Sequence, residues 1–530
     1  MLPNSALDDR FQDPRFVHAF LQRLPAYLAT QRWFTSKSKD LQACKIRDSY
    51  RLAEDYALVI IETHYADGTQ ELFQMPLAQL TRVEDQKQYL KRTPNLVVFR
   101  VPGGPYLVDA VPLPAFRRDV YEMIRNEART RDGLNCECGK LLRQAPATLD
   151  STVPSIDTSN TAIIYGNRFF FKLFRKLDPG LNPDLELVRY LSENTTFANC
   201  PPYGGSLGVG KMKDADYLNL GMLSGMVENQ GDAWELFQDL TRRYFVDNDG
   251  EVDEETIQRA ELLGRRTAEM HQALATRLPV EGGGGAGAMI VPQPLTAEYR
   301  AEISTAAQKL LDRQVGDLES KVDGLPPFQQ RLAREVLELA PGIRHHLDRF
   351  RDRPMDMELI RIHADYHLGQ VLVTKDDFVI IDFEGEPLLT IPERRRRRPA
   401  LKDVAGMVRS FHYAIYAQTL LNPERFADYN PVRMDREIRH WYRTVMNAYL
   451  NAYFNTADEY AGTGGAAFLP ASETDRRDML FLFMLEKAVY EVAYELNSRP
   501  AWLSVPLMGV LGAAGALSIG ADEHHAADNQ

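Results

Sequence analysis

The stretch from residue 362 to 387 limits the fold of this chain more than any other. It contains two apolar runs rich in β-branched residues, 371–374 and 378–381, separated by a short polar turn. This pattern predicts a β-hairpin. In an antiparallel hairpin the residue that enters the first strand lies beside the residue that leaves the second. We therefore expect Gln370 and Asp382 to meet at one end of the ladder.

Oxygen-bearing side chains surround this end of the predicted ladder. Asp365 precedes the hairpin on a loop and can face the same point, and Glu384 closely follows Asp382. The arrangement suits phosphoryl transfer, in which a carboxylate accepts the proton of the attacking hydroxyl and oxygen ligands hold magnesium on the nucleotide phosphates. We predict that Asp365 is the catalytic base and that Gln370, Asp382 and Glu384 hold the metal. The alternative interpretation is an ordinary surface hairpin with acidic ends.

The same residues resemble a known family. His363-x-Asp365, an amide at Gln370 and an apolar hairpin ending in Asp382-Phe383 resemble the catalytic core of the aminoglycoside-phosphotransferase and protein-kinase-like superfamily. The segments HADYHLGQ (363–370) and DFEGEP (382–387) are similar to the signature of bacterial maltokinases, which use ATP to phosphorylate maltose at its anomeric hydroxyl. The chain departs from that signature at Ala364 and Tyr366, where the family usually has Gly and Leu.

The resemblance covers nearly the whole chain and implies its architecture. It implies an α+β, bilobal protein-kinase-like fold with an N-terminal β-rich cap (1–105), a β-sheet nucleotide-binding lobe (106–227), a mostly helical C-terminal lobe (228–520) and a disordered tail (521–530). It also implies ATP and Mg²⁺ as cofactors and maltose as the substrate. The product would be maltose 1-phosphate, which feeds α-glucan and glycogen synthesis, and trehalose synthase is a candidate partner.

A second predicted hairpin joins 161–165 to 169–174 through a Gly166-Asn167 turn and carries a lysine in the middle of an apolar strand. Lys172 would be costly there without an anionic partner, and Glu186 is the expected one. The sequence Asn182-Pro183 begins a helix, with Asn182 as N-cap and Pro183 at the first helical position. In kinases a strand lysine paired with a helix glutamate orients the α- and β-phosphates. The alternative is a lysine that snorkels at a strand edge. The residues expected to cover the phosphates are Ser159, Asn160 and Thr161.

A predicted helix over 481–497 carries a polar aromatic stripe. Lys487, Tyr490 and Tyr494 fall at positions i, i+3 and i+7, so they share one face. Aromatic rings with hydroxyl tips, beside a charged donor, suit a sugar, although spacing alone favours a core stripe. In the maltokinases the matching positions contribute to the maltose pocket. The resemblance therefore implies that these residues bind the acceptor, and we add His367 of the loop to the candidates.

Composition limits the partners of the chain. Its 530 residues carry a formal net charge of −12, which argues against nucleic acid or an anionic membrane as a partner. Four cysteines form neither a disulfide framework nor a zinc pattern, so we expect a cytoplasmic location. The uncharged segment 500–520 contains Pro506 and several glycines, and is expected to pack against the protein. The arginines at 394–398 predict a solvated or ion-paired face.

The remaining expectations concern secondary structure. We expect a helix within 11–30, strands over 44–101 with a turn at Asp67-Gly68, and helices over 295–314 and 325–351. A helix over 402–411 is expected to pack under the loop that carries Asp365. The glycine-rich segment 281–287 predicts a flexible linker.

Two alternative functions remain open. One is a kinase for another small acceptor, such as glucosamine or an aminoglycoside, whose positive charge would favour an acidic pocket. The other is a non-catalytic nucleotide-binding module, which the presence of Asp365, Asp382 and Lys172 disfavours.

Overall fold

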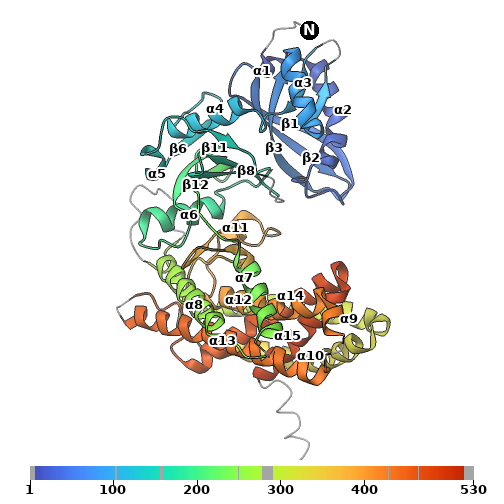
Figure 1. The fold of residues 1–530 in the computed structure, drawn as a ribbon, viewed down its shortest axis with the longest axis vertical. Coiled ribbons are helices and arrows are strands. Elements are labelled where there is room, and N and C mark those ends of the chain that lie inside the picture. The colour runs from blue at the N-terminus through green and yellow to red at the C-terminus, as the bar shows by residue number, and fades with distance from the viewer. Residues whose placement is uncertain are drawn as a thin grey trace, which may run out of the picture. The chain divides into compact units, whose positions relative to one another are not determined.

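The computed structural model describes residues 6–101, 104–154, 159–248, 250–276, 290–427, 429–462 and 465–517. The chain divides into two compact units, drawn in Figure 1. The first unit consists of residues 1–194, 201–227 and 388–393, and the second of residues 195–200, 228–387 and 394–530. The linker expected at 281–287 and the tail after residue 520 lie outside the described residues.

The N-terminal part of the first unit is a sheet with helices. Its core joins apolar residues of α2, among them Phe16, Phe20 and Leu24, to buried residues of β2 and β3. The strand order is β1-β2-β3-β5-β4, and Gly68, at φ 81°, makes the predicted turn between β2 and β3. The elements are α1 (Leu7–Arg10), α2 (Pro14–Thr30), β1 (Leu41–Arg51), β2 (Tyr56–Tyr65), β3 (Gln70–Leu80), β4 (Val97–Arg100) and β5 (Tyr106–Asp109).

The expectation of strands throughout 44–101 was wrong for one segment. Residues Val83–Arg92 form helix α3, in which only Tyr89 is buried. Glu84 and Asp85 lie in its first turn, and Lys91 and Arg92 lie in its last turn. These charges complement the helix dipole and stabilise a helix that buries little apolar surface.

The second sheet of the first unit has the order β6-β11-β12-β9-β8-β7. Gly166 and Asn167, at φ 56° and 50°, form the predicted hairpin turn between β8 and β9. Asn182 caps α6 as predicted, since its Oδ1 accepts from Asp184 N–H at 2.8 Å. The elements are α4 (Pro114–Arg125), β6 (Leu134–Cys138), α5 (Lys140–Arg143), β7 (Ser151–Thr152), β8 (Thr161–Tyr165), β9 (Phe169–Leu173), α6 (Pro183–Asn194), β11 (Tyr203–Val209) and β12 (Leu218–Gly225).

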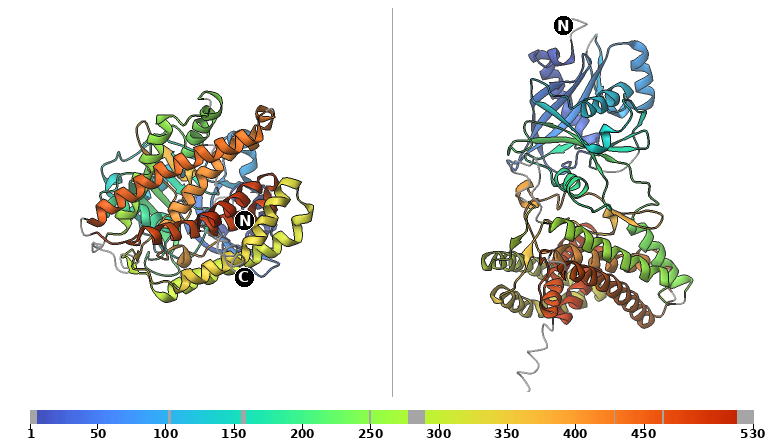
Figure 2. Two further views of the ribbon diagram at one scale, coloured as in Figure 1. Left: turned by 90° about the horizontal axis from the view of Figure 1, so that it is seen from below. Right: turned by 90° about the vertical axis from the view of Figure 1, so that its left-hand side faces the viewer.

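The second unit is mostly helical. The helices expected over 295–314 and 325–351 are α9 and α10, which lie side by side and are yellow to orange in Figure 2. Segment 500–520 packs as expected, because α15 buries residues such as Leu507 and Val510. The helices are α7 (Ala233–Val246), α8 (Glu254–Leu274), α9 (Ala297–Lys321), α10 (Pro327–Asp352), α12 (Leu401–Leu421), α13 (Pro431–Gly462), α14 (Glu473–Ser498) and α15 (Ser504–Ala516).

Short strands accompany these helices. β13 (Gln293–Pro294) pairs with β14 (Glu358–Leu359), and β15 (Val371–Val373) pairs with β16 (Phe378–Ile380). The second pair is the hairpin predicted from the 362–387 stretch. Within the described ranges, none of the helices combines the length and apolar character needed to cross a bilayer.

Candidate active site

The β15–β16 hairpin brings two predicted site residues together. Val371 pairs with Ile380 at the end of the ladder, and just beyond it the Gln370 side-chain amide donates to Asp382 Oδ2 at 3.0 Å. The meeting of these side chains follows the prediction. Asp382 has φ 67°, a left-handed backbone conformation that is uncommon outside glycine. Such strained residues gather at functional sites.

Helix α12 holds the loop that precedes the hairpin. Asp403 accepts hydrogen bonds from the backbone N–H groups of His363 at 2.7 Å and of Ala364 at 2.8 Å. Ser410 Oγ accepts from Leu368 N–H at 3.1 Å. The close approach needs Gly406, because a Cβ there would lie 2.6 Å from the carbonyl oxygen of Tyr366. The prediction that this helix packs under the loop is confirmed.

Asp403 is a functional residue that the sequence reasoning missed. It lies within the helix predicted to support the loop, but a loop-holding role was not assigned to it. Its carboxylate is buried and also lies 3.2 Å from His271 Nε2. The signal in the sequence was an acidic residue in the 402–411 helix, which was expected to pack under the loop that carries Asp365.

The departure at Tyr366 has a structural explanation. Its side chain is buried, and its hydroxyl lies 3.0 Å from Thr267 Oγ1 on α8. Burial raises the pKa of Tyr366, so the phenol stays neutral. Tyr366 therefore packs the loop against α8.

His367 lies among the predicted catalytic and acceptor residues. Its Nδ1 accepts from Gly369 N–H at 3.1 Å. Burial lowers the pKa of His367, and the charge of Lys487 acts in the same direction, whereas Asp365 and Asp382 oppose it. Glu384 is half-buried two residues beyond Asp382.

The aromatic stripe lies on α14 and is open to solvent. Tyr490 is 42% exposed and Tyr494 is 51% exposed, so the core interpretation of the stripe is wrong. Lys487 Nζ lies 5.5 Å from the centre of the Tyr490 ring. Partial burial raises the pKa of Tyr490, as do the negative charges of Glu386 and Asp365.

The carboxylates of α14 near the stripe are neutralised by cations of the same unit. Glu491 pairs with buried Arg409 at 2.7 Å, and Glu495 pairs with Arg499 at 2.6 Å. Glu486 pairs with Lys402 at 3.2 Å. The helix therefore presents aromatic rings and an ammonium, with these acidic charges already paired.

The predicted nucleotide residues lie in the first unit. Lys172 Nζ on β9 donates to Asp184 Oδ2 on α6 at 2.9 Å, and Asp184 is buried. Asp184 was not predicted, because helical spacing does not tell which of two acids in one turn reaches the strand. The pairing of Lys172 with buried Glu186 stays a prediction.

The three predicted phosphate-covering residues lie at or just before the start of β8. Thr161 Oγ1 accepts from Arg175 Nε at 2.8 Å, so its hydroxyl supports the start of β8. Ser159 is exposed and Asn160 is half-buried beside it.

The donor set at the hairpin fits magnesium in chemical type. Asp382 and Glu384 supply carboxylate oxygens, and the Gln370 amide oxygen can accept or coordinate while its NH₂ group binds Asp382. In the part of the chain that the structure describes, no cluster of three His, Cys, Asp or Glu side chains is placed to hold a metal alone. Magnesium commonly completes its coordination with water and substrate phosphates, which is compatible with such a partial set.

Two family models match parts of this chain. The model described as "Phosphotransferase enzyme family" matches residues 217–386, and the maltokinase N-terminal cap domain matches residues 27–111. A glucosamine kinase of Streptacidiphilus jiangxiensis is 25% identical over 356 residues, which span 66% of this chain and 70% of the relative. A glucosamine kinase of Mycolicibacterium smegmatis is 30% identical over 147 residues, or 27% of this chain and 32% of the relative.

Solved structures show the same fold. A glucosamine kinase in complex with glucosamine, ADP and inorganic phosphate has a TM-score of 0.63 and 19% identity, covering 92% of this chain and 98% of the other. Crystal form B of a glucosamine kinase has a TM-score of 0.64 and 20% identity, covering 91% and 96%. The fold is therefore that of a bilobal, kinase-like protein.

The family match and the kinase-like fold support a kinase-like phosphotransferase. Within that class the chain resembles the bacterial maltokinases of the protein-kinase-like superfamily, since it matches both the phosphotransferase family and the maltokinase cap domain.

Proposed function

We propose that this protein transfers the γ-phosphoryl group of ATP to the anomeric hydroxyl of maltose, giving maltose 1-phosphate. The observation that carries the proposal is the exposed tyrosine stripe of α14, with the Lys487 ammonium 5.5 Å from the centre of the Tyr490 ring. The charge of Asp365 is one of the causes that raise the pKa of Tyr490. A base beside an aromatic sugar platform suits transfer to a sugar hydroxyl. The match to the maltokinase cap domain supports maltose as the sugar.

The chain's residues divide the work of the reaction. Asp365 accepts the proton of the attacking hydroxyl, while Lys172, held by Asp184, aligns the nucleotide phosphates. Gln370, Asp382 and Glu384 would hold magnesium, which neutralises charge that develops on the phosphates. The loop needs a fixed position for this, and Asp403 provides it through the amides of His363 and Ala364.

Electrostatics of the acceptor side favour a neutral sugar. Glu491 and Glu495 alternate with the tyrosines on α14, but each is bound to an arginine. The Lys487 ammonium lies on the same face as Tyr490. A cationic aminosugar would meet this ammonium while both of these carboxylates are engaged by arginines, and like charges repel.

Glucosamine is the second candidate acceptor. It is favoured by the names of the relatives, since two curated relatives and the solved structures described above are glucosamine kinases. In that case a carboxylate outside α14, such as Glu386 on the loop beyond Asp382, would have to bind the amine.

An assay of ADP release across acceptors tests the proposal. We expect kcat/KM for maltose to exceed the values for glucose, glucosamine and kanamycin at least about tenfold, a difference of ~1.4 kcal/mol in transition-state binding. Phosphorus NMR of the product should show a phosphate coupled to the anomeric proton. A higher kcat/KM for glucosamine would establish the second candidate instead. ATP binding without turnover of any acceptor would favour the non-catalytic module.

A further inference from the structure

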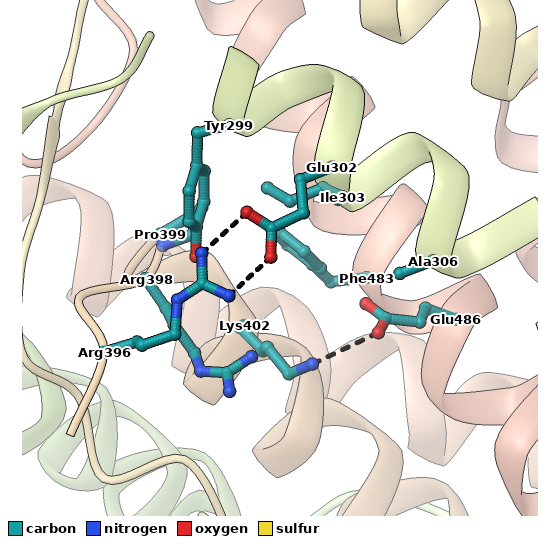
Figure 3. Close-up of a pocket in the computed structure, with 10 residues that line it drawn as sticks. All are labelled: Tyr299, Glu302, Ile303, Ala306, Arg396, Arg398, Pro399, Lys402, Phe483 and Glu486. Atoms are coloured by element: carbon teal, nitrogen blue, oxygen red, sulfur yellow. Dashed lines mark hydrogen bonds and ion pairs between the residues drawn. The ribbon is translucent and has the colours of Figure 1, made fainter. Parts of the chain in front are cut away.

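The second unit contains a small, charged cavity that the proposed reaction does not use. Its volume is about 80 Å³, far below the roughly 300–1,000 Å³ of a typical small-molecule or cofactor site. It is lined by α9, the arginine segment, the start of α12, and α14 (Figure 3). The lining residues are Tyr299, Glu302, Ile303, Ala306, Arg396, Arg398, Pro399, Lys402, Phe483 and Glu486.

Charged side chains of both signs line this cavity. Three cationic side chains, Arg396, Arg398 and Lys402, face two carboxylates, Glu302 and Glu486. The charge of Arg398 acts to lower the pKa of Lys402, and both residues line the cavity. Although burial lowers the pKa of Lys402, the charges of Glu486 and Glu386 raise it overall, and the ammonium stays protonated. The Arg396 guanidinium and the Lys402 ammonium are therefore the groups of the cavity that an anion can bind.

Arg396 is oriented as a fork at the cavity. Its guanidinium lies 5.4 Å from the centre of the Tyr299 ring, and the Tyr299 hydroxyl donates to the carbonyl oxygen of Arg397 at 3.0 Å. Both terminal nitrogens of Arg396 face the two carboxylate oxygens of Glu302, one of them at 2.7 Å (Figure 3). This paired geometry is the one in which arginine binds carboxylate or phosphate oxygens.

Glu302 can be displaced from Arg396. The two side chains are 53% and 42% exposed, and exposed ion pairs contribute little to stability. A doubly charged phosphate group could take the position of the Glu302 carboxylate and reach the deeper Lys402. Lys402 Nζ lies 3.2 Å from Glu486 and 3.9 Å from Glu386, so it connects the cavity with the loop beyond Asp382.

We propose that this cavity, bounded by Arg396, Arg398 and Lys402, is a binding site for a single phosphate group. The group belongs either to inorganic phosphate or to a small phosphate monoester. It binds the Arg396 fork in place of Glu302 and lies against Lys402. Because Lys402 also contacts Glu386 and Glu486, an occupied site loosens these two carboxylates from the ammonium. Glu386 lies on the loop beyond Asp382, and Glu486 precedes Lys487 on α14.

Isothermal titration of the full chain tests the site without any requirement for turnover. The titrants are inorganic phosphate and glucose 1-phosphate at fixed ionic strength, with chloride as the reference salt. We expect saturable binding that Arg396→Gln weakens at least about tenfold. Arg395→Gln removes the same charge from the same run but does not line the cavity, and it should change the dissociation constant less than twofold.

A variant that is expected to bind phosphate more tightly separates a true loss of the site from a loss of binding caused by misfolding. Glu302→Gln removes the competing carboxylate and should tighten phosphate binding several-fold, whereas Glu298→Gln, one turn earlier on α9, should not. Tighter binding of glucose 1-phosphate than of inorganic phosphate identifies the monoester as the ligand, and the reverse order identifies the free ion.

Two outcomes would overturn the site. One is the absence of saturable binding by the unmodified chain at about 10 mM phosphate, a concentration of the millimolar order at which weak sites fill. The other is an equal response of the Arg395→Gln and Arg396→Gln variants, which would show unspecific attraction or binding at the nucleotide site. Failure of the maltose assay leaves these binding results unchanged, so the two proposals fail separately.

Discussion

Asp403 fixes Ala364 in a backbone conformation that alanine rarely adopts. The carboxylate accepts the Ala364 N–H at 2.8 Å, and Ala364 has φ 69°. An L-residue in the left-handed region costs roughly 1–2 kcal/mol, whereas glycine adopts it freely. The resemblance to maltokinases, which usually have Gly here, thus concerns a position where the backbone itself favours Gly.

Ala364→Gly should therefore leave the free energy of unfolding unchanged or raise it by up to about 1 kcal/mol. The reason is that the relieved strain equals or exceeds the cost of the added entropy of the unfolded chain. Urea unfolding measures the difference. Ala301→Gly, inside α9, is the control and should cost about 1 kcal/mol. Equal destabilisation by both changes would show that the loop is not strained at Ala364.

Asp365→Asn should lower kcat by about 10²–10⁴-fold, the usual contribution of a general base, and leave the KM for ATP nearly unchanged. The ADP-release assay measures both constants. Asp376→Asn, at the exposed turn of the same hairpin, is the charge-matched control and should retain activity within about twofold. Full turnover by the Asp365→Asn variant would exclude this residue as the base.

Lys172→Met should raise the KM for ATP or lower kcat at least about tenfold, because the side chain that aligns the phosphates is lost. Asp184→Asn should reproduce much of the defect, since Asp184 accepts from Lys172 at 2.9 Å. Comparison with Glu186→Gln separates the observed partner from the predicted one. If only the Glu186→Gln variant were impaired, Asp184 would have no part in positioning the lysine.

Tyr490→Ala should raise the KM for the acceptor about tenfold and leave the KM for ATP unchanged, because the exposed ring faces the sugar in the proposed site. Steady-state kinetics with each substrate varied in turn measures the effect. Phe328→Ala on α10 removes another exposed ring, which is 50% exposed, and serves as the control. A change confined to the KM for ATP would remove the stripe from the acceptor site.

Glu71 gives the first unit a dependence on pH. Although burial opposes ionisation, hydrogen bonds from Ser36, Lys176 and Tyr65 lower the pKa of Glu71 from 4.5 to about 2. The folded-state pKa lies below the unfolded one, so this carboxylate stabilises the fold above about pH 4.5. That contribution is lost as the pH falls toward 2.

Glu71→Gln should therefore destabilise the protein most near neutral pH, and the difference from the unmodified chain should shrink between pH 4.5 and 2. Urea unfolding at several pH values, followed by circular dichroism, measures it. Glu84→Gln on exposed α3 should leave the curve unchanged. A difference that stays constant across this range would contradict the assigned pKa.

The sequence predicted elements that depend on local patterns. The β15–β16 hairpin, the Asn182 cap and the turns at Gly68 and Gly166-Asn167 follow from short-range periodicity and backbone preference. The meeting of Gln370 and Asp382 follows from hairpin geometry alone.

Features that depend on contacts between distant segments were not predictable in this way. Asp403 and Ala364 are 39 residues apart, and no local pattern states which side chain of the supporting helix reaches the amides of the loop. The contact of Asp184 with Lys172 depends on the rotation of α6 against β9. Helix α3 was missed because its polar composition lacks the apolar periodicity that marks a helix.

One short strand links the N-terminal sheet to the strands around Lys172. β10 (Lys176–Leu177) pairs with Leu72 and Phe73 of β3, only a few residues after Lys172 on β9. Deletion of the first hundred residues would remove β3, expose the edge of β10 and leave the segment that follows Lys172 without this support. The N-terminal sheet therefore supports the segment that follows Lys172. Mutations in this sheet, although distant from the proposed site, are expected to lower activity by displacing that segment.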